Sequence, residues 1–252
     1  MPFINAYTMK VWATTVITFF ALGWTIAQPP SQLNDYLLTG GSTQGHKAEE
    51  RITNLVNKLQ AKRGKSDRQF LGSVFSVAHR QLLKEYKQYS GFGELFTNGR
   101  YDCLTATALY SLVLDRLGFE YSIVETNYHI FLMVKTDEGE VLIESTDPID
   151  GFVDNPKEVA ERLKSYKESG PSPGEGFYDA QFNLFQAVDT HQLVGLLYFN
   201  QAVKAFNNQQ WAKAADLLEY TKKYYVSPRV DEMETLLHYV AEPGVSLVQR
   251  DE

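Results

Sequence analysis

The chain has 252 residues, of which 44% are hydrophobic and 13% aromatic, and this composition excludes a protein that is disordered throughout. Its formal net charge of −7 argues against a nucleic-acid partner, because an acidic surface repels phosphate backbones. The single cysteine, Cys103, excludes an intramolecular disulfide.

Residues 1–27 have the layout of an export signal. They contain one base, Lys10, and no acid, and a mostly apolar run over residues 11–27 follows. Small residues before Gln28 suit cleavage after Ala27, which we favour. The alternative is that the run remains as a single tilted membrane anchor, because a full span needs about 20 residues. Both alternatives predict an exported protein, periplasmic, extracellular or membrane-anchored.

Residues 28–46 are rich in Pro, Gly, Ser and Asn and are predicted to be a linker. The predicted core spans residues 47–168. It begins with two amphipathic helices, because apolar residues recur there at spacings of three and four. These residues are Ile52, Leu55, Val56 and Leu59 in the first helix, and Phe70, Leu71, Val74, Phe75, Ala78, Leu82 and Leu83 in the second.

A third helix is predicted to begin at Cys103. Asp102 is a favourable N-cap, apolar residues continue to Leu117, and Gly118 is a suitable C-terminal stop.

Three short strands are expected next, over residues 121–124, 128–136 and 140–143. The loop at 137–139 predicts a hairpin between the last two. The middle strand is apolar on both faces, so we expect a small antiparallel sheet covered by helices, with the Cys103 helix as one cover.

Residues 169–187 are predicted to be a second linker, and residues 188–252 return to a helical pattern. Within the latter, residues 200–228 resemble a single tetratricopeptide unit. The alternative, which we favour because one repeat cannot bury its apolar face alone, is an ordinary helical hairpin docked on the core. The matching residues are Ala202, Phe206, Trp211, Ala214 and Leu218, with Pro228 after the second helix.

Cys103 and His129 are a candidate nucleophile and base. A thiol is activated by a helix N-terminus and by an imidazole that accepts its proton. The first turn of the predicted helix directs N–H groups at the Cys103 sulfur and at an oxyanion, although Asp102 partly offsets this positive end. Asn98 is a further candidate oxyanion donor. Turn chemistry favours the simpler alternative, in which Asn98 only forms a turn with Gly99.

An acid on the neighbouring strand should orient His129, and the hairpin register decides between two candidates. If residues 137–139 form a three-residue loop, His129 lies opposite Asp147. If only residues 137–138 form the loop, Glu144 lies diagonally across on the side of His129. Glycine at the third loop position favours Asp147, but a slip of one residue reverses every facing, so Glu144 stays open.

Three segments in this order resemble the bacterial transglutaminase-like domain of the papain-like cysteine superfamily. They are Gly99-Arg100-Tyr101-Asp102-Cys103-Leu104-Thr105-Ala106, His129-Ile130-Phe131-Leu132 and Glu144-Ser145-Thr146-Asp147-Pro148. The resemblance covers roughly residues 90–155. It implies an α+β fold in which Cys103 is the nucleophile, His129 the base, and Asp147 or Glu144 the orienting acid. Phe131 stands where the family usually has Trp; Glu144 matches a common spacing and Asp147 the Asp-Pro dipeptide.

The resemblance implies a cysteine-dependent amidase, peptidase or acyl-transferase that acts on an amide or ester of a peptide, a protein or cell-wall material. A second hypothesis is an inactive binding or scaffold module of the same fold. It would hold a protein partner on the C-terminal helices, where exposed aromatics are expected at Tyr220, Tyr224 and Tyr225. We expect no cofactor and no metal, because the histidines do not stand at metal-ligand spacings.

Overall fold

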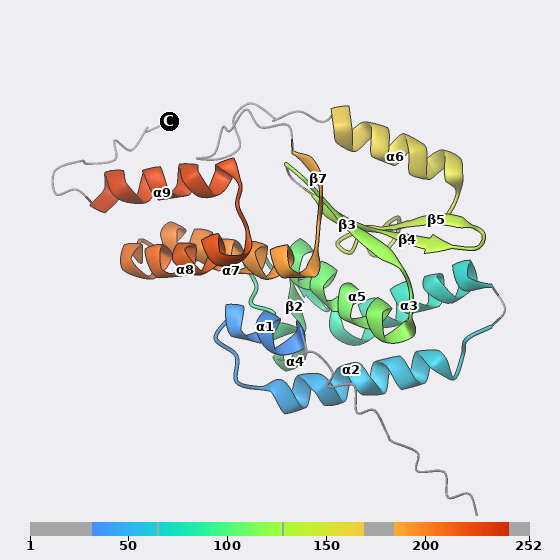
Figure 1. Cartoon of the computed structure of the whole chain (residues 1–252). Helices are drawn as coiled ribbons and strands as arrows, with labels where there is room; N and C mark the ends of the chain where they lie inside the picture. Colours follow the sequence, from blue (N-terminus) through green and yellow to red (C-terminus); the bar gives the residue numbers. More distant parts are fainter. Residues whose placement is uncertain (1–31, 65, 128, 169–183, 242–252) are drawn as a thin grey trace, which may run out of the picture.

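The computed structural model describes residues 32–64, 66–127, 129–168 and 184–241 (Figure 1). The predicted export segment and most of the second predicted linker lie outside these residues. None of the helices in the described ranges is long and apolar enough to span a membrane.

A five-stranded antiparallel sheet with the strand order β6-β5-β4-β3-β7 forms the centre of the fold. Together with several helices it confirms the predicted α+β class. A separate parallel pair, β1 (Glu85–Tyr86) and β2 (Arg100–Tyr101), precedes it. The strands of the main sheet are β3 (Tyr121–Thr126), β4 (Ile130–Thr136), β5 (Gly139–Ile143), β6 (Phe152–Val153) and β7 (Phe185–Val188).

Helices cover both faces of this sheet, as the apolar pattern of β4 predicts. Ile130, Leu132 and Val134 point into the larger core with α5 (Cys103–Leu117), and α3 (Asp67–Leu82) contributes to the same core. Phe131 and Met133 point the other way, into a smaller core under α6 (Pro156–Glu168). Figure 1 shows α6 on one side of the sheet and α5 on the other.

The helix of Cys103 begins and ends as predicted. Asp102 forms a capping box with Thr105, in which each side chain binds the other residue's backbone N–H group. Gly118 ends the helix in the left-handed conformation, at φ 77°, which glycine adopts without steric cost. The other predicted helices correspond to α2 (Gly45–Gln60) and α3.

Both predicted linkers contain regular structure. Residues 32–39 form α1 (Gln32–Thr39), which buries Leu33, Tyr36 and Leu37 in the larger core. The end of the second linker forms β7, which pairs with β3. The linker prediction was therefore wrong for these two stretches, because tertiary packing orders segments that are too short to show a clear period.

The C-terminal helices pack on the core. Helices α7 (Thr190–Asn207) and α8 (Trp211–Tyr224) form a hairpin, α9 (Pro228–Ala241) contacts α8, and α7 contacts both α1 and α5. The arrangement is a hairpin docked on the core. Tyr220 is exposed, but Tyr225 is buried, so the expectation of an exposed Tyr225 was wrong. The short helix α4 (Glu94–Thr97) lies between β1 and β2 in the chain.

Candidate functional site at the end of the sheet

Cys103 is the first residue of α5 and is half-buried against the larger core. Burial and, to a smaller extent, the adjacent Asp102 carboxylate raise the pKa of its thiol to about 12. The backbone N–H groups of the first turn act in the opposite direction but do not prevail. The thiol is therefore protonated at neutral pH, and the helix N-terminus alone does not activate it.

Asp102 is committed to structural contacts. It is buried, and one carboxylate oxygen accepts hydrogen bonds from the backbone N–H and the hydroxyl of Thr105, both at 2.9 Å. The other oxygen accepts a hydrogen bond of 2.6 Å from the side-chain amide of Asn200, on α7. Asp102 thus joins the start of α5 to the C-terminal hairpin.

The β4–β5 register corrects the predicted hairpin. Thr136 pairs with Gly139 and Leu132 with Ile143, so only residues 137–138 form the loop, and the favoured three-residue loop was wrong. The Thr136 hydroxyl closes this tighter turn, because it donates to the Gly139 carbonyl at 2.6 Å and accepts from the Glu138 N–H at 3.1 Å. Gly139, at φ 115°, starts the strand after the loop.

Asp147 shapes a turn. Its Oδ1 accepts hydrogen bonds from the backbone N–H groups of Ile149, at 3.0 Å, and Asp150, at 2.9 Å. These bonds, above all the one from Asp150, lower the pKa of the Asp147 carboxyl. The carboxylate that contacts His129 is that of Glu144.

His129 and Glu144 form a pair on the side of the sheet that α6 covers. Nδ1 of His129 lies 3.6 Å from Oε1 of Glu144, which is longer than a hydrogen bond but within the range of an ion pair. The side chain of Glu144 is 10% exposed, whereas that of His129 is 46% exposed. Oε2 of Glu144 accepts a hydrogen bond from the Tyr166 hydroxyl and lies 3.4 Å from Nη1 of Arg162. Both partners belong to α6.

Cys103 and His129 make their described side-chain contacts with different partners. His129 precedes β4, and its ring lies 5.2 Å from the Tyr166 ring of α6 at an angle of 34°, whereas Cys103 packs against the larger core. No hydrogen bond joins the two side chains in the described part of the chain. Ser145 links the two regions. It follows Glu144 in the chain, and its hydroxyl donates a 3.5 Å hydrogen bond to the Cys103 carbonyl oxygen.

Asn98 makes the contact of a turn residue. It is exposed, and its Oδ1 accepts a 3.0 Å hydrogen bond from the backbone N–H of Arg100. This contact belongs to the turn alternative, and the described contacts of Asn98 include none with Cys103.

Sequence reasoning missed three residues of this region: Arg162, Tyr166 and Asn200. A signal for α6 was present, because Pro156 suits a helix start and Val159 and Tyr166 recur on one face. Nothing in that pattern indicates that α6 docks on Glu144, since docking depends on contacts between distant parts of the chain.

Comparison of the chain with protein-family models, with curated proteins and with solved structures found no match. The functional argument therefore rests on the residues and the geometry described above. Within the described ranges, no three His, Cys, Asp or Glu side chains form a group that could hold a metal ion.

Proposed function

We propose that this protein is an exported, transglutaminase-like cysteine hydrolase or acyl-transferase, with Cys103 as nucleophile and His129 as base. The pair of His129 and Glu144 is the observation that supports the proposal. A half-exposed imidazole beside a buried carboxylate is the arrangement of a base and its orienting acid. Arg162 and Tyr166 hold that carboxylate in turn, so its position does not depend on the histidine.

The two ring nitrogens of His129 take different roles in this proposal. With Nδ1–H directed at Glu144, the lone pair of Nε2 is free to accept a proton. Because the pKa of Cys103 is about 12, the thiol gives up its proton as the sulfur attacks the substrate carbonyl, rather than before. This step requires a hydrogen bond between Cys103 and His129 that forms when substrate binds, since catalytic hydrogen bonds often tighten only in the complex.

The chemistry then proceeds through a thioester. The sulfur bonds to the carbonyl carbon, the first-turn N–H groups of α5 stabilise the oxyanion, and His129 returns its proton to the departing amine or alcohol. Water or a second amine then attacks the thioester and releases Cys103. Amides of peptides, proteins or cell-wall material are the proposed substrates, on the basis of expected export alone.

A second candidate is a binding module in which Cys103 is inert. The raised thiol pKa favours it, as does the lack of a hydrogen bond between Cys103 and His129 in the described residues. The C-terminal helices, on which Tyr220 is exposed, would then hold a protein partner.

Acylation of Cys103 separates the two candidates. The folded protein is treated with p-nitrophenyl acetate at neutral pH, and mass spectrometry follows acetylation, with Cys103→Ala as the blank. The enzyme proposal predicts faster labelling than for the same chain in urea, and a loss of about tenfold or more in His129→Ala. Equal rates in folded, unfolded and His129→Ala protein would show an unactivated thiol and leave the binding module.

A further inference from the structure

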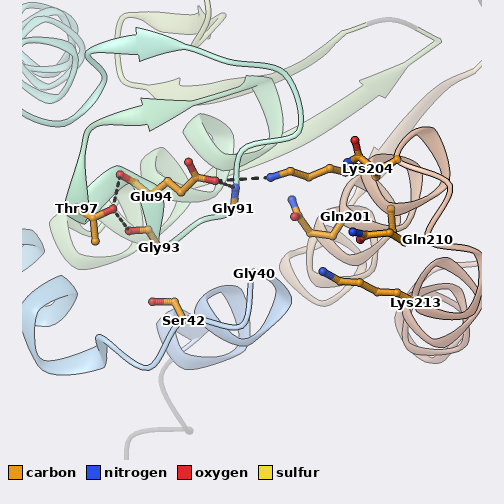
Figure 2. Close-up of a pocket in the computed structure, with 12 residues that line it drawn as sticks. Gly40, Ser42, Gly91, Gly93, Glu94, Thr97, Gln201, Lys204, Gln210 and Lys213 are labelled. Carbon is orange, nitrogen blue, oxygen red and sulfur yellow. Dashed lines mark hydrogen bonds and ion pairs between the residues drawn. The ribbon is translucent and has the colours of Figure 1, made fainter.

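A polar cavity lies apart from the residues discussed so far. Its volume is about 470 Å³, and it lies between the segments around residues 40–42 and 91–97 on one side and helices α7 and α8 on the other (Figure 2). This volume suits a small molecule. Neither Cys103, His129 nor Glu144 lines it.

Two lysines give this cavity a positive charge within an acidic chain. Lys204 lies 3.8 Å from Oε1 of Glu94, and the same oxygen also accepts a 3.0 Å hydrogen bond from the Gly91 N–H. Lys213 makes no ion pair with any described residue, and Figure 2 shows its side chain extending along the cavity wall towards Ser42. Two lysines against one glutamate leave an uncompensated positive charge.

The polar neutral side chains of the lining are amides and hydroxyls, glycines and Ala205 complete it, and it contains no aromatic side chain. The amide nitrogen of Gln201 already donates to the carbonyls of Tyr89, at 3.3 Å, and Ser90, at 3.2 Å, so its oxygen is the atom left to accept a hydrogen bond. Without an aromatic platform the cavity cannot stack a nucleobase. The remaining polar lining residues are Ser42, Thr97, Asn208 and Gln210.

The start of α8 adds to the positive field. Gln210 is its N-cap and makes no side-chain capping hydrogen bond, and both Gln210 and Lys213 line the cavity. The first N–H groups of a helix have no partner within the helix and favour negative charge nearby.

We propose that this cavity binds a small polar anion, in which a carboxylate or phosphate group lies between Lys204 and Lys213 and a body with hydroxyl or amide groups meets the neutral lining. The site does not depend on the proposed enzyme function, since none of its residues takes part in that chemistry. Both anionic groups have the oxygen acceptors that lysine ammonium groups bind.

Calorimetric titration at constant ionic strength tests the site with two probes, glycerol phosphate and N-acetylglutamate. We expect saturable binding of at least one probe, weakened about tenfold in Lys213→Gln, because a hydrogen bond to a charged group is lost. Lys204→Gln should weaken binding less, since Glu94 already engages that lysine. Binding of one probe alone identifies the anionic group, and binding of both shows that the site recognises the negative charge that the two probes share.

Lys157→Gln is the matched control, because its side chain is highly exposed on α6 and does not line the cavity. Thermal unfolding of all three variants shows that they remain folded. Absence of saturable binding for both probes overturns the proposal. So does an equal loss of affinity in Lys157→Gln, which would indicate a response to overall charge.

Discussion

Glu125 and Glu144 are two buried carboxylates of one sheet, and each has a tyrosine and an arginine as partners. Glu125, in β3, accepts a 2.6 Å hydrogen bond from the hydroxyl of Tyr225 and lies 3.2 Å from Nη1 of Arg229. Glu144, after β5, has Tyr166 and Arg162 in the same roles.

The third partner distinguishes them. For Glu125 it is the side-chain amide of Gln186, at 2.9 Å, which does not titrate, whereas for Glu144 it is His129. Glu125 is 2% exposed and is surrounded by groups that stay protonated at neutral pH, since burial raises the pKa of Tyr225 well above its usual value. The same acid, tyrosine and arginine therefore form a cluster closed by an amide in one place and a cluster that includes a half-exposed histidine in the other.

The largest expected effect is a loss of stability in Glu125→Gln. The substitution leaves Arg229, whose side chain is 23% exposed, without its buried counter-charge, and we expect a loss of about 3 kcal/mol in the free energy of unfolding by urea. Glu85→Gln is the control, because its pair with Arg100 is exposed and should contribute about 0.5 kcal/mol or less. Similar losses in the two variants would show that the Glu125 cluster is not structural.

Glu144→Gln should lower the stability less than Glu125→Gln does, but should slow the acetylation of Cys103. The side chain of Arg162 is 33% exposed and can be solvated when the charge is lost, so we expect a stability loss of about 1 kcal/mol. Acetylation of Cys103 should slow about tenfold, because His129 loses the acid that orients it. If Glu144→Gln is as destabilising as Glu125→Gln and leaves acetylation unchanged, the two clusters do not differ in kind.

His79 and His129 also differ in their surroundings, because His79 is buried, whereas His129 is half-exposed. Burial lowers the pKa of His79 below its usual 6.5, so the unfolded chain binds more protons than the native state as the pH falls past that value. This contribution to stability is complete above pH 6.5 and is lost as the pH falls towards the folded-state pKa.

His79→Phe should therefore flatten the dependence of the unfolding free energy on pH between about pH 7 and 5. Phenylalanine suits the site, which already contains the rings of Phe75, Tyr101 and Tyr110. Equal slopes in His79→Phe and the natural chain would contradict the assignment.

Local patterns predicted the elements that carry the candidate site but not their contacts. Asp102 and Gly118 mark the ends of α5 because capping depends on neighbours in the chain. The helix α1 and the four-residue strand β7 are too short to show a clear period. Arg229 reaches Glu125 from more than a hundred residues away, and no local pattern records such a contact.

The glycine at position 139 is compatible with two hairpin registers. Gly139 has a positive φ, which fits the last position of a three-residue loop and equally the first residue of a strand after a two-residue loop. The Thr136 hydroxyl, which bonds to both Glu138 and Gly139, supports the second arrangement. That choice moved the contact with His129 from Asp147 to Glu144.

Asp147→Asn should have the smallest effect and tests this choice of acid directly. Asparagine keeps the Oδ1 that accepts from Ile149 and Asp150, so we expect stability at neutral pH to change by about 0.5 kcal/mol or less. Acetylation of Cys103 should proceed at the rate of the natural chain, whereas Glu144→Gln should slow it. A tenfold loss in Asp147→Asn with none in Glu144→Gln would restore Asp147 as the orienting acid, and would mean that the strand end rearranges before His129 acts.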